Sequence, residues 1–121
     1  MHYMHGLGII SQYSDNITMC RVKCMPEPKS GRLLAASADM MHFSGCRGRL
    51  LIDSCYFAGA QDDAINIHGT NLKVVEKVSS NTLNMRFSHG QSYGFQAYFT
   101  GDTVAFVKAT TMERRSTASV H

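Results

Sequence analysis

The sequence predicts an all-β chain that begins with coils of a parallel β-helix and continues as a small antiparallel β segment. Three observations support this fold class. The first 70 residues contain an internal repeat, the sequence changes to hairpin-like alternation after residue 70, and the apolar segments lack a helical period. These segments are short, rich in Ile, Leu and Met, and bounded by Gly, Ser, Asn or Asp, which is typical of strands.

The first repeat joins two segments of about twenty residues. Residues 5–24 align with residues 38–57 at an offset of 33, which pairs Ile10 with Phe43 and Ile17 with Leu50. Strands that return in the same direction after about 20–30 residues, without an intervening helix, indicate stacked turns of a parallel β-helix.

The second repeat uses a shorter offset. Residues 38–45 align with residues 62–69 at an offset of 24, which places Asp39 on Asp63. The difference between the two offsets equals the nine residues of the polar insert 25–33, which holds both prolines of the chain. We therefore expect almost three coils within residues 1–70, one of them enlarged by a turn.

Alternation within the repeated segments predicts which side chains face the coil interior. Met41, Phe43, Ile65 and Ile67 are expected inside, provided that the chain bends or bulges just after each repeated aspartate. The outward positions expected on the surface of the coils are Asp39, His42, Ser44, Asp63, Asn66 and His68.

The sequence after residue 70 predicts different elements. Residues 71–87 suggest a hairpin with a Ser-Ser-Asn turn, and residues 101–108 suggest a further strand. We therefore predict three parts: coils in 1–70, an antiparallel, barrel-like segment in 71–108, and a polar, frayed tail in 109–121.

Composition excludes several classes of function. Apolar residues make up 44% and charged residues 17% of the chain, which is a globular composition. No apolar run approaches the roughly 18 residues of a membrane span, and the first residues lack the features of a signal peptide. The net charge of +3 is scattered, so nucleic-acid binding is not expected. The sequence does not indicate an oligomeric state.

The cysteines do not predict a metal centre. Cys20, Cys24 and Cys46 could join His42 as ligands, but no CxxC pair or HxxxH spacing supports a zinc site. Buried free thiols are common in packed interiors, and we expect no metal.

Three carboxylates are the candidate chemical groups. On adjacent coils, Asp39 and Asp63 would lie about 5 Å apart, where like charges repel, whereas Asp62 would point in another direction. An arrangement of two close carboxyl groups with a third set apart from them is suited to inverting glycoside hydrolysis. In that reaction a general acid and a water-activating base lie roughly 6.5–9.5 Å apart. The alternative is a solvated turn, in which such Asp-Asp pairs are also common.

Three stretches resemble glycoside hydrolase family 110, the bacterial α-1,3-galactosidases: residues 3–19, 38–70 and 86–107. The resemblance implies a right-handed parallel β-helix with additional β-barrel domains. It also implies removal of terminal α-galactose from a galactose-terminated glycan with inversion, and no metal or organic cofactor. By family habit the parent protein is expected to be periplasmic or secreted, and this chain is expected to be a fragment of it.

Carried over position by position, the family's acidic residues fall on Asp39, Asp62 and Asp63. Their order resembles that of polygalacturonase-type β-helix enzymes, which implies that Asp62 is the general acid and that the other two hold the attacking water. The expected substrate-binding residues are His42, Asn66 and His68, although such side chains often only satisfy nearby backbone groups. His89, Gln91 and Tyr93 are weaker candidates for the edge of the pocket.

Two other readings remain open from the sequence. One is a non-catalytic, carbohydrate-binding β-helix module, which would not need the three aspartates. The other is a polygalacturonase-like hydrolase, for which Arg47 and Arg49 would be the available basic residues. The sequence does not distinguish branched from linear α-1,3-galactosides, and the isolated fragment could be inactive.

Overall fold

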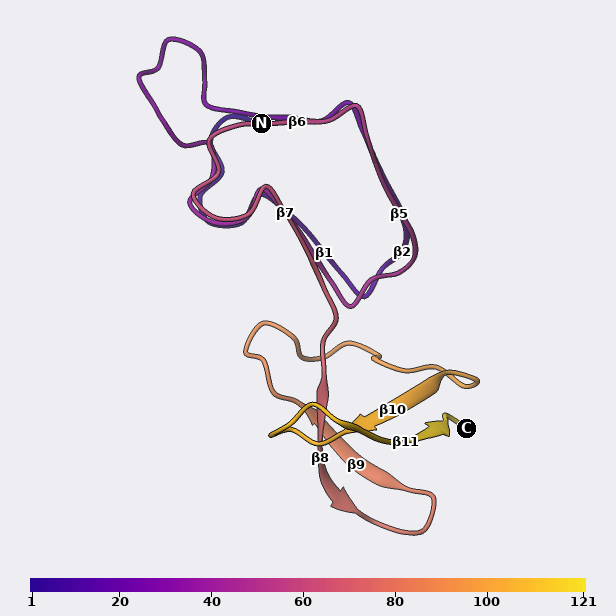
Figure 1. Cartoon of the computed structure of the whole chain (residues 1–121). Coiled ribbons are helices and arrows are strands. Elements are labelled where there is room, and N and C mark those ends of the chain that lie inside the picture. Colours follow the sequence, from indigo (N-terminus) through magenta and orange to yellow (C-terminus); the bar gives the residue numbers. More distant parts are fainter.

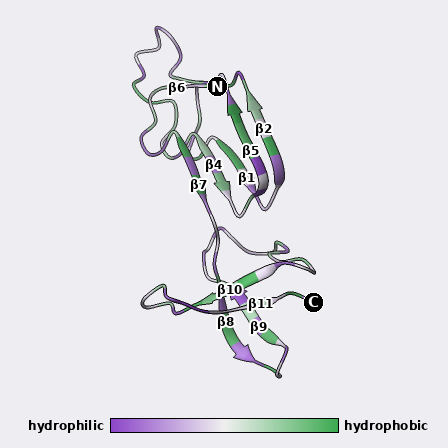
Figure 2. Ribbon diagram, turned by 45° about the vertical axis from the view of Figure 1, so that its right-hand side comes forward, coloured by the Kyte–Doolittle hydropathy of each residue, from purple (hydrophilic) through white to green (hydrophobic).

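The computed structural model describes all 121 residues and contains eleven strands and no helix (Figure 1). The predicted all-β class is confirmed. No helix is present that could cross a membrane. In both views the chain passes from β7 directly into β8, so that the parallel strands lie in one part and the antiparallel strands in another (Figure 2).

The first part contains seven short strands in three parallel ladders. The ladder β1-β4-β7 has three strands, whereas β2-β5 and β3-β6 have two each. Viewed as in Figure 1, the successive turns of chain trace nearly the same outline. The strands are β1 (Ile9–Gln12), β2 (Asp15–Cys20), β3 (Lys23–Cys24), β4 (Met41–Ser44), β5 (Arg47–Asp53), β6 (Tyr56–Phe57) and β7 (Ile65–His68).

The register agrees with the predicted offset of 24 and partly with that of 33. Ile17 pairs with Leu50, as predicted, but Ile10 pairs with His42 rather than with Phe43. A β-bulge near the start of the β2–β5 ladder accounts for this one-residue difference. A bulge of this kind has no apolar pattern of its own, so the alignment could not detect it.

The nine-residue insert lies between β3 and the bridge that pairs Ala36 with Ala60. Twelve positions separate Cys24 from Ala36, whereas three separate their paired residues, Phe57 and Ala60. The additional residues form the loop that projects from the outline in Figure 1. The ladders on both sides of this loop remain paired.

Residues with left-handed backbone conformations lie next to one another at the turns between the parallel ladders. Tyr13 (φ 48°) lies beside Gly45 (φ 63°), and Asn16 (φ 53°) lies beside Gly48 (φ 67°). A Cβ atom on Gly45 would lie 2.8 Å from the Tyr13 ring, so this corner requires glycine both for its φ angle and for its space.

The core is small, and more than half of its buried residues lie in β4 or directly before it. Only nine residues are buried, and Met40, Met41 and Phe43 are among those without solvent exposure. Ile67, expected inside, is 61% exposed because β7 is the last strand of its ladder. Asp39 and Ser44, both expected outside, are buried, and the Ser44 hydroxyl accepts a hydrogen bond from Gln12 at 3.1 Å.

The second part consists of two antiparallel hairpins that do not join into a closed sheet. One pairs β8 (Leu72–Lys77) with β9 (Leu83–Phe87), and the other pairs β10 (Thr103–Val107) with β11 (Arg114–Ser119). The structure differs here from the predicted polar tail, 109–121, because that segment contains β11. All six β11 residues are exposed, so the strand lacks an apolar signal in the sequence. The boundary near residue 70 stays a prediction.

The loop before β10 packs back against the part that holds the parallel ladders. The Arg47 guanidinium makes two hydrogen bonds to the Asp102 carboxylate, at 3.0 and 2.7 Å, and stacks over the Phe99 ring. Phe95 stacks on Tyr13 with ring centroids 4.8 Å apart. A bidentate ion pair and an aromatic stack therefore connect the two parts next to the coil edge.

Candidate active site

The three predicted aspartates converge. One oxygen from each of Asp39, Asp62 and Asp63 lies within 4.8 Å of the other two. Asp39 comes just before β4, and the other two come just before β7, the next strand of the same ladder. The amide of Met40 donates to the Asp63 carbonyl at 2.9 Å, so backbone pairing extends up to the acidic positions and brings the carboxylates together.

Asp39 is the buried member of the trio. It is only 5% exposed, and its Oδ2 accepts hydrogen bonds from His42 Nδ1 at 2.6 Å and from Asn66 Nδ2 at 3.1 Å. The hydrogen bond from His42 is the main reason that the pKa of Asp39 lies below its usual value. Burial acts in the opposite direction, and Asn66 and the backbone of Asp63 add to the lowering. Asp39 is therefore a carboxylate near neutral pH, whereas Asp62 and Asp63 lie exposed beside it.

The three predicted substrate-binding residues join the same cluster in different ways. His42 and Asn66 contact Asp39 directly. His68 does not; its Nε2 lies 3.0 Å from Nε2 of His42, and its Nδ1 lies 2.8 Å from the Gly69 carbonyl oxygen. All six predicted site residues thus occur in one patch, with His68 at its exposed side.

A polar cavity of about 300 Å³ begins at His68. His89, a weaker candidate in the sequence, lines it, but Gln91 and Tyr93 do not. The carbonyl of Gln91 accepts a hydrogen bond from Gln12, and Tyr93 is 72% exposed. Thr70, Asn71 and Ser88 could not be predicted from the repeat, because they follow β7 or β9 and have no repeated counterpart. The cavity is lined by His68, Gly69, Thr70, Asn71, Ser88 and His89.

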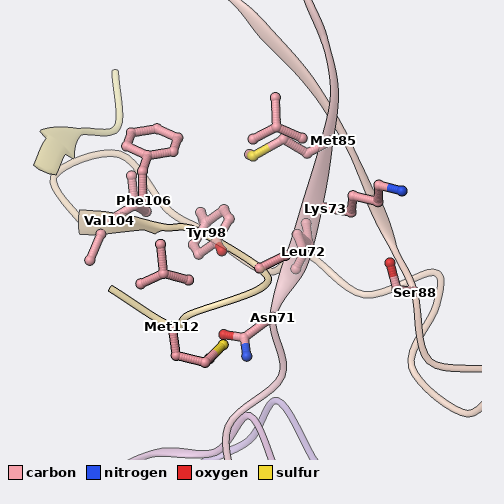
Figure 3. A pocket seen from close by; sticks show the side chains of 13 residues that line it. Asn71, Leu72, Lys73, Met85, Ser88, Tyr98, Val104, Phe106 and Met112 are labelled. Atoms are coloured by element: carbon pink, nitrogen blue, oxygen red, sulfur yellow. The ribbon is translucent and has the colours of Figure 1, made fainter. Parts of the chain in front are cut away.

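A second cavity, of about 520 Å³, lies between the two hairpins and differs from the first in its lining. Figure 3 shows Leu72 and Met85 of the first hairpin on one side and Val104 and Phe106 of β10 on the other, with Tyr98 between them. Most of its lining is apolar, and it contains none of the six predicted site residues. The catalytic candidates therefore lie at the edge of the β1-β4-β7 ladder and not in this apolar cavity.

The site offers no separate argument for a metal ion. Three carboxylates this close together could coordinate a cation, but exposed acidic clusters are common in proteins without a bound ion. The Oδ2 atom of Asp39 already accepts two hydrogen bonds. The four cysteines are free thiols, and burial raises the pKa of Cys24. We assign no metal ligands here.

Known proteins that the chain resembles are named Alpha-1,3-galactosidase A or B. The chain is 73% identical over 99% of its length to Alpha-1,3-galactosidase A of Bacteroides fragilis, of which it covers 20%. It is 46% identical over 92% of its length to Alpha-1,3-galactosidase A of Bacteroides thetaiotaomicron, again covering 20% of that protein. It is 42% identical over 93% of its length to Alpha-1,3-galactosidase B of Phocaeicola vulgatus, of which it covers 19%.

The C-terminal part matches a family model as well. Residues 82–121 match the GLAA-B beta-barrel domain II, and this range includes the segment that was predicted to be a tail. The chain spans about a fifth of the length of the relatives that it matches. The predicted resemblance to the bacterial α-1,3-galactosidases is confirmed.

Proposed function

We propose that this chain, homologous over nearly its whole length to about a fifth of an α-1,3-galactosidase, carries the catalytic carboxylates of such an enzyme. The reaction is hydrolysis of a terminal α-1,3-linked galactose from a glycan, with inversion at the anomeric carbon. The observation that carries the proposal is the convergence of Asp39, Asp62 and Asp63 within 4.8 Å at one coil edge.

Each carboxylate has a proposed role. Asp62 donates its proton to the glycosidic oxygen as the bond to the anomeric carbon breaks. Asp39 and Asp63 hold a water on the opposite face of the sugar and take its proton as the oxygen attacks. The products are β-galactose and the shortened glycan. The lowered pKa of Asp39 supports its role as a base, because it is ionised before the water arrives.

The carboxylate spacing alone does not select inversion. Inverting glycosidases usually separate their two carboxyl groups by roughly 6.5–9.5 Å, and retaining ones by about 5–5.5 Å. One oxygen of each aspartate here lies within 4.8 Å of the others, which is closer to the retaining range. The support for inversion comes from the family resemblance and from the pairing of Asp39 with Asp63, which gives a water two acceptors.

The neighbouring side chains divide into two roles under this proposal. His42 and Asn66 hold Asp39, since their nitrogen atoms already contact its carboxylate. His68 and the polar cavity next to it are open to solvent and can contact the sugar hydroxyls. A galactose-terminated oligosaccharide is thus the proposed ligand, and no cofactor is required.

The fold proposal follows the same resemblance. We propose that the three parallel ladders are coils of a right-handed parallel β-helix, with the two hairpins forming part of a barrel next to it. A periplasmic or secreted parent protein is the corresponding expectation. A polygalacturonase-like activity is less well supported, because the Arg47 side chain is already paired with Asp102.

A chimera tests the proposal. This chain replaces the matching fifth of the Bacteroides fragilis relative, and galactose release from a linear and a branched α-1,3-galactoside is followed by NMR. The expected first product is β-galactose, lost in Asp62→Asn but retained in Asp53→Asn, an exposed aspartate on another ladder. Initial α-galactose would overturn inversion. Sugar binding without hydrolysis in the folded chimera would instead support a non-catalytic binding module.

A further inference from the structure

Three hydrogen-bond contacts follow one another from the buried carboxylate to the exposed edge of β7. Asp39 Oδ2 lies 2.6 Å from His42 Nδ1, and His42 Nε2 lies 3.0 Å from His68 Nε2. His68 Nδ1 then lies 2.8 Å from the carbonyl oxygen of Gly69. Both imidazoles therefore use both of their nitrogens within this chain of contacts.

The contacts fix the number of protons. A carbonyl oxygen only accepts, so His68 Nδ1 must carry a hydrogen. If Asp39 is ionised, His42 Nδ1 must carry one as well. A neutral imidazole carries one hydrogen, and in both rings that hydrogen would then be on Nδ1. Neither Nε2 atom would carry a hydrogen, so two lone pairs would face each other across the 3.0 Å between them. A third proton is needed to make that contact a hydrogen bond.

We propose that His42 and His68 share one proton between their Nε2 atoms, so that the pair carries a single positive charge opposite an ionised Asp39. The pair acts as one positioning unit, because it holds the orientation and the charge of Asp39 without touching the reacting atoms. The two rings come from adjacent strands of one ladder, and their near-perpendicular arrangement, 78° between planes, directs the nitrogens toward each other.

The groups around His42 and His68 favour a single positive charge on the two imidazoles. Asn66 also donates to Asp39 Oδ2, which favours the carboxylate form and places the third proton on the imidazoles. Asp62 and Asp63 lie beside Asp39, so negative charge predominates on that side. On the other side, His89 shares the polar cavity with His68 and is the titratable group there.

The consequence for catalysis rests on the proposed function. At alkaline pH the pair loses its shared proton, the Nε2 atoms repel, and Asp39 loses a positive partner. The activity is therefore expected to fall on the alkaline side. In His68→Gln the amide NH2 can donate to His42 Nε2 without any additional proton, so this part of the pH profile should disappear.

NMR of the chain labelled with ¹⁵N-histidine tests the proton count directly. At neutral pH we expect Nε2 of both His42 and His68 to resonate between the protonated and unprotonated positions, and both to change in one shared step as the pH rises. In His68→Gln, His42 should show a proton on Nδ1 and none on Nε2. The matched control, His5→Gln, changes an exposed histidine outside the cluster and should leave both signals unchanged.

Several outcomes would overturn the proposal. Nε2 atoms that are both unprotonated at neutral pH, or rings that titrate independently, would contradict a shared proton. A pH profile of the chimera that is identical in His68→Gln would contradict the catalytic consequence. The failures are distinguishable: a shared proton in an inactive, folded chimera would refute the proposed function only, and an active chimera without a shared proton would refute this inference only.

Discussion

The contact between His42 and Asp39 gives a quantitative prediction about stability. Replacing His42 with alanine leaves a buried carboxylate, 5% exposed, with one hydrogen-bond donor in place of two. Hydrogen bonds to charged groups contribute about 1.5–3 kcal/mol, and Asn66 remains as a second donor. We therefore expect His42→Ala to lower the free energy of unfolding at neutral pH by about 1.5 kcal/mol, the lower end of that range.

The pH dependence of this loss identifies its cause. The pKa of Asp39 is lowered in the folded chain, so its contribution to stability is present above its unfolded pKa of 3.8 and is lost as the pH falls through the folded value. The difference between wild type and His42→Ala should therefore shrink as the solution is acidified below pH 3.8.

Urea denaturation at several pH values measures this difference. His42→Gln, which keeps a donor at this position, should lose less stability than His42→Ala, and His5→Ala should change little because His5 is exposed. A difference that stays constant down to strongly acidic pH would refute the reasoning, since it would point to lost packing instead of a lost interaction with the carboxylate.

Three further predictions follow from other parts of the structure. Asp62→Asn in the chimera should reduce kcat by about 10²–10⁴-fold with a smaller change in KM, as expected for loss of a general acid; an unchanged kcat would exclude that role. Arg47→Lys should make the loop before β10 more sensitive to limited proteolysis, because lysine cannot form the bidentate pair with Asp102; equal cleavage of both proteins would contradict the proposed connection. Gly45→Ala should destabilise the chain by about 1–2 kcal/mol through its positive φ and the crowded corner, whereas Gly90→Ala, with no neighbour within 4 Å, should not; equal urea midpoints would contradict this.

The parts that repeat could be predicted from the sequence. The alignment of Asp39 with Asp63 relied on an offset that the parallel ladder β4–β7 preserves, and His42, Asn66 and His68 were expected near them for the same reason. A repeated register specifies which side chains are neighbours without any knowledge of the rest of the chain.

The parts that depend on irregular or distant contacts could not be predicted. The bulge in the β2–β5 ladder shifts one register by a residue, and β11 pairs through its backbone with exposed, polar side chains. The contact of Arg47 with Asp102 joins residues 55 positions apart that belong to different patterns. The proton shared by the imidazoles depends on which nitrogen faces which atom, and a one-dimensional sequence does not contain that information.

The loop 25–33 has a consequence for engineering. It adds nine residues at one corner, yet the strands on both sides keep their partners in the adjacent coil. Chain length at this corner is therefore independent of the spacing between the carboxylates. A peptide epitope or a fluorescent reporter spliced into the loop should be tolerated without a change in the position of Asp39, whereas a single residue inserted within β4 would reverse the faces of every side chain that follows it in the strand.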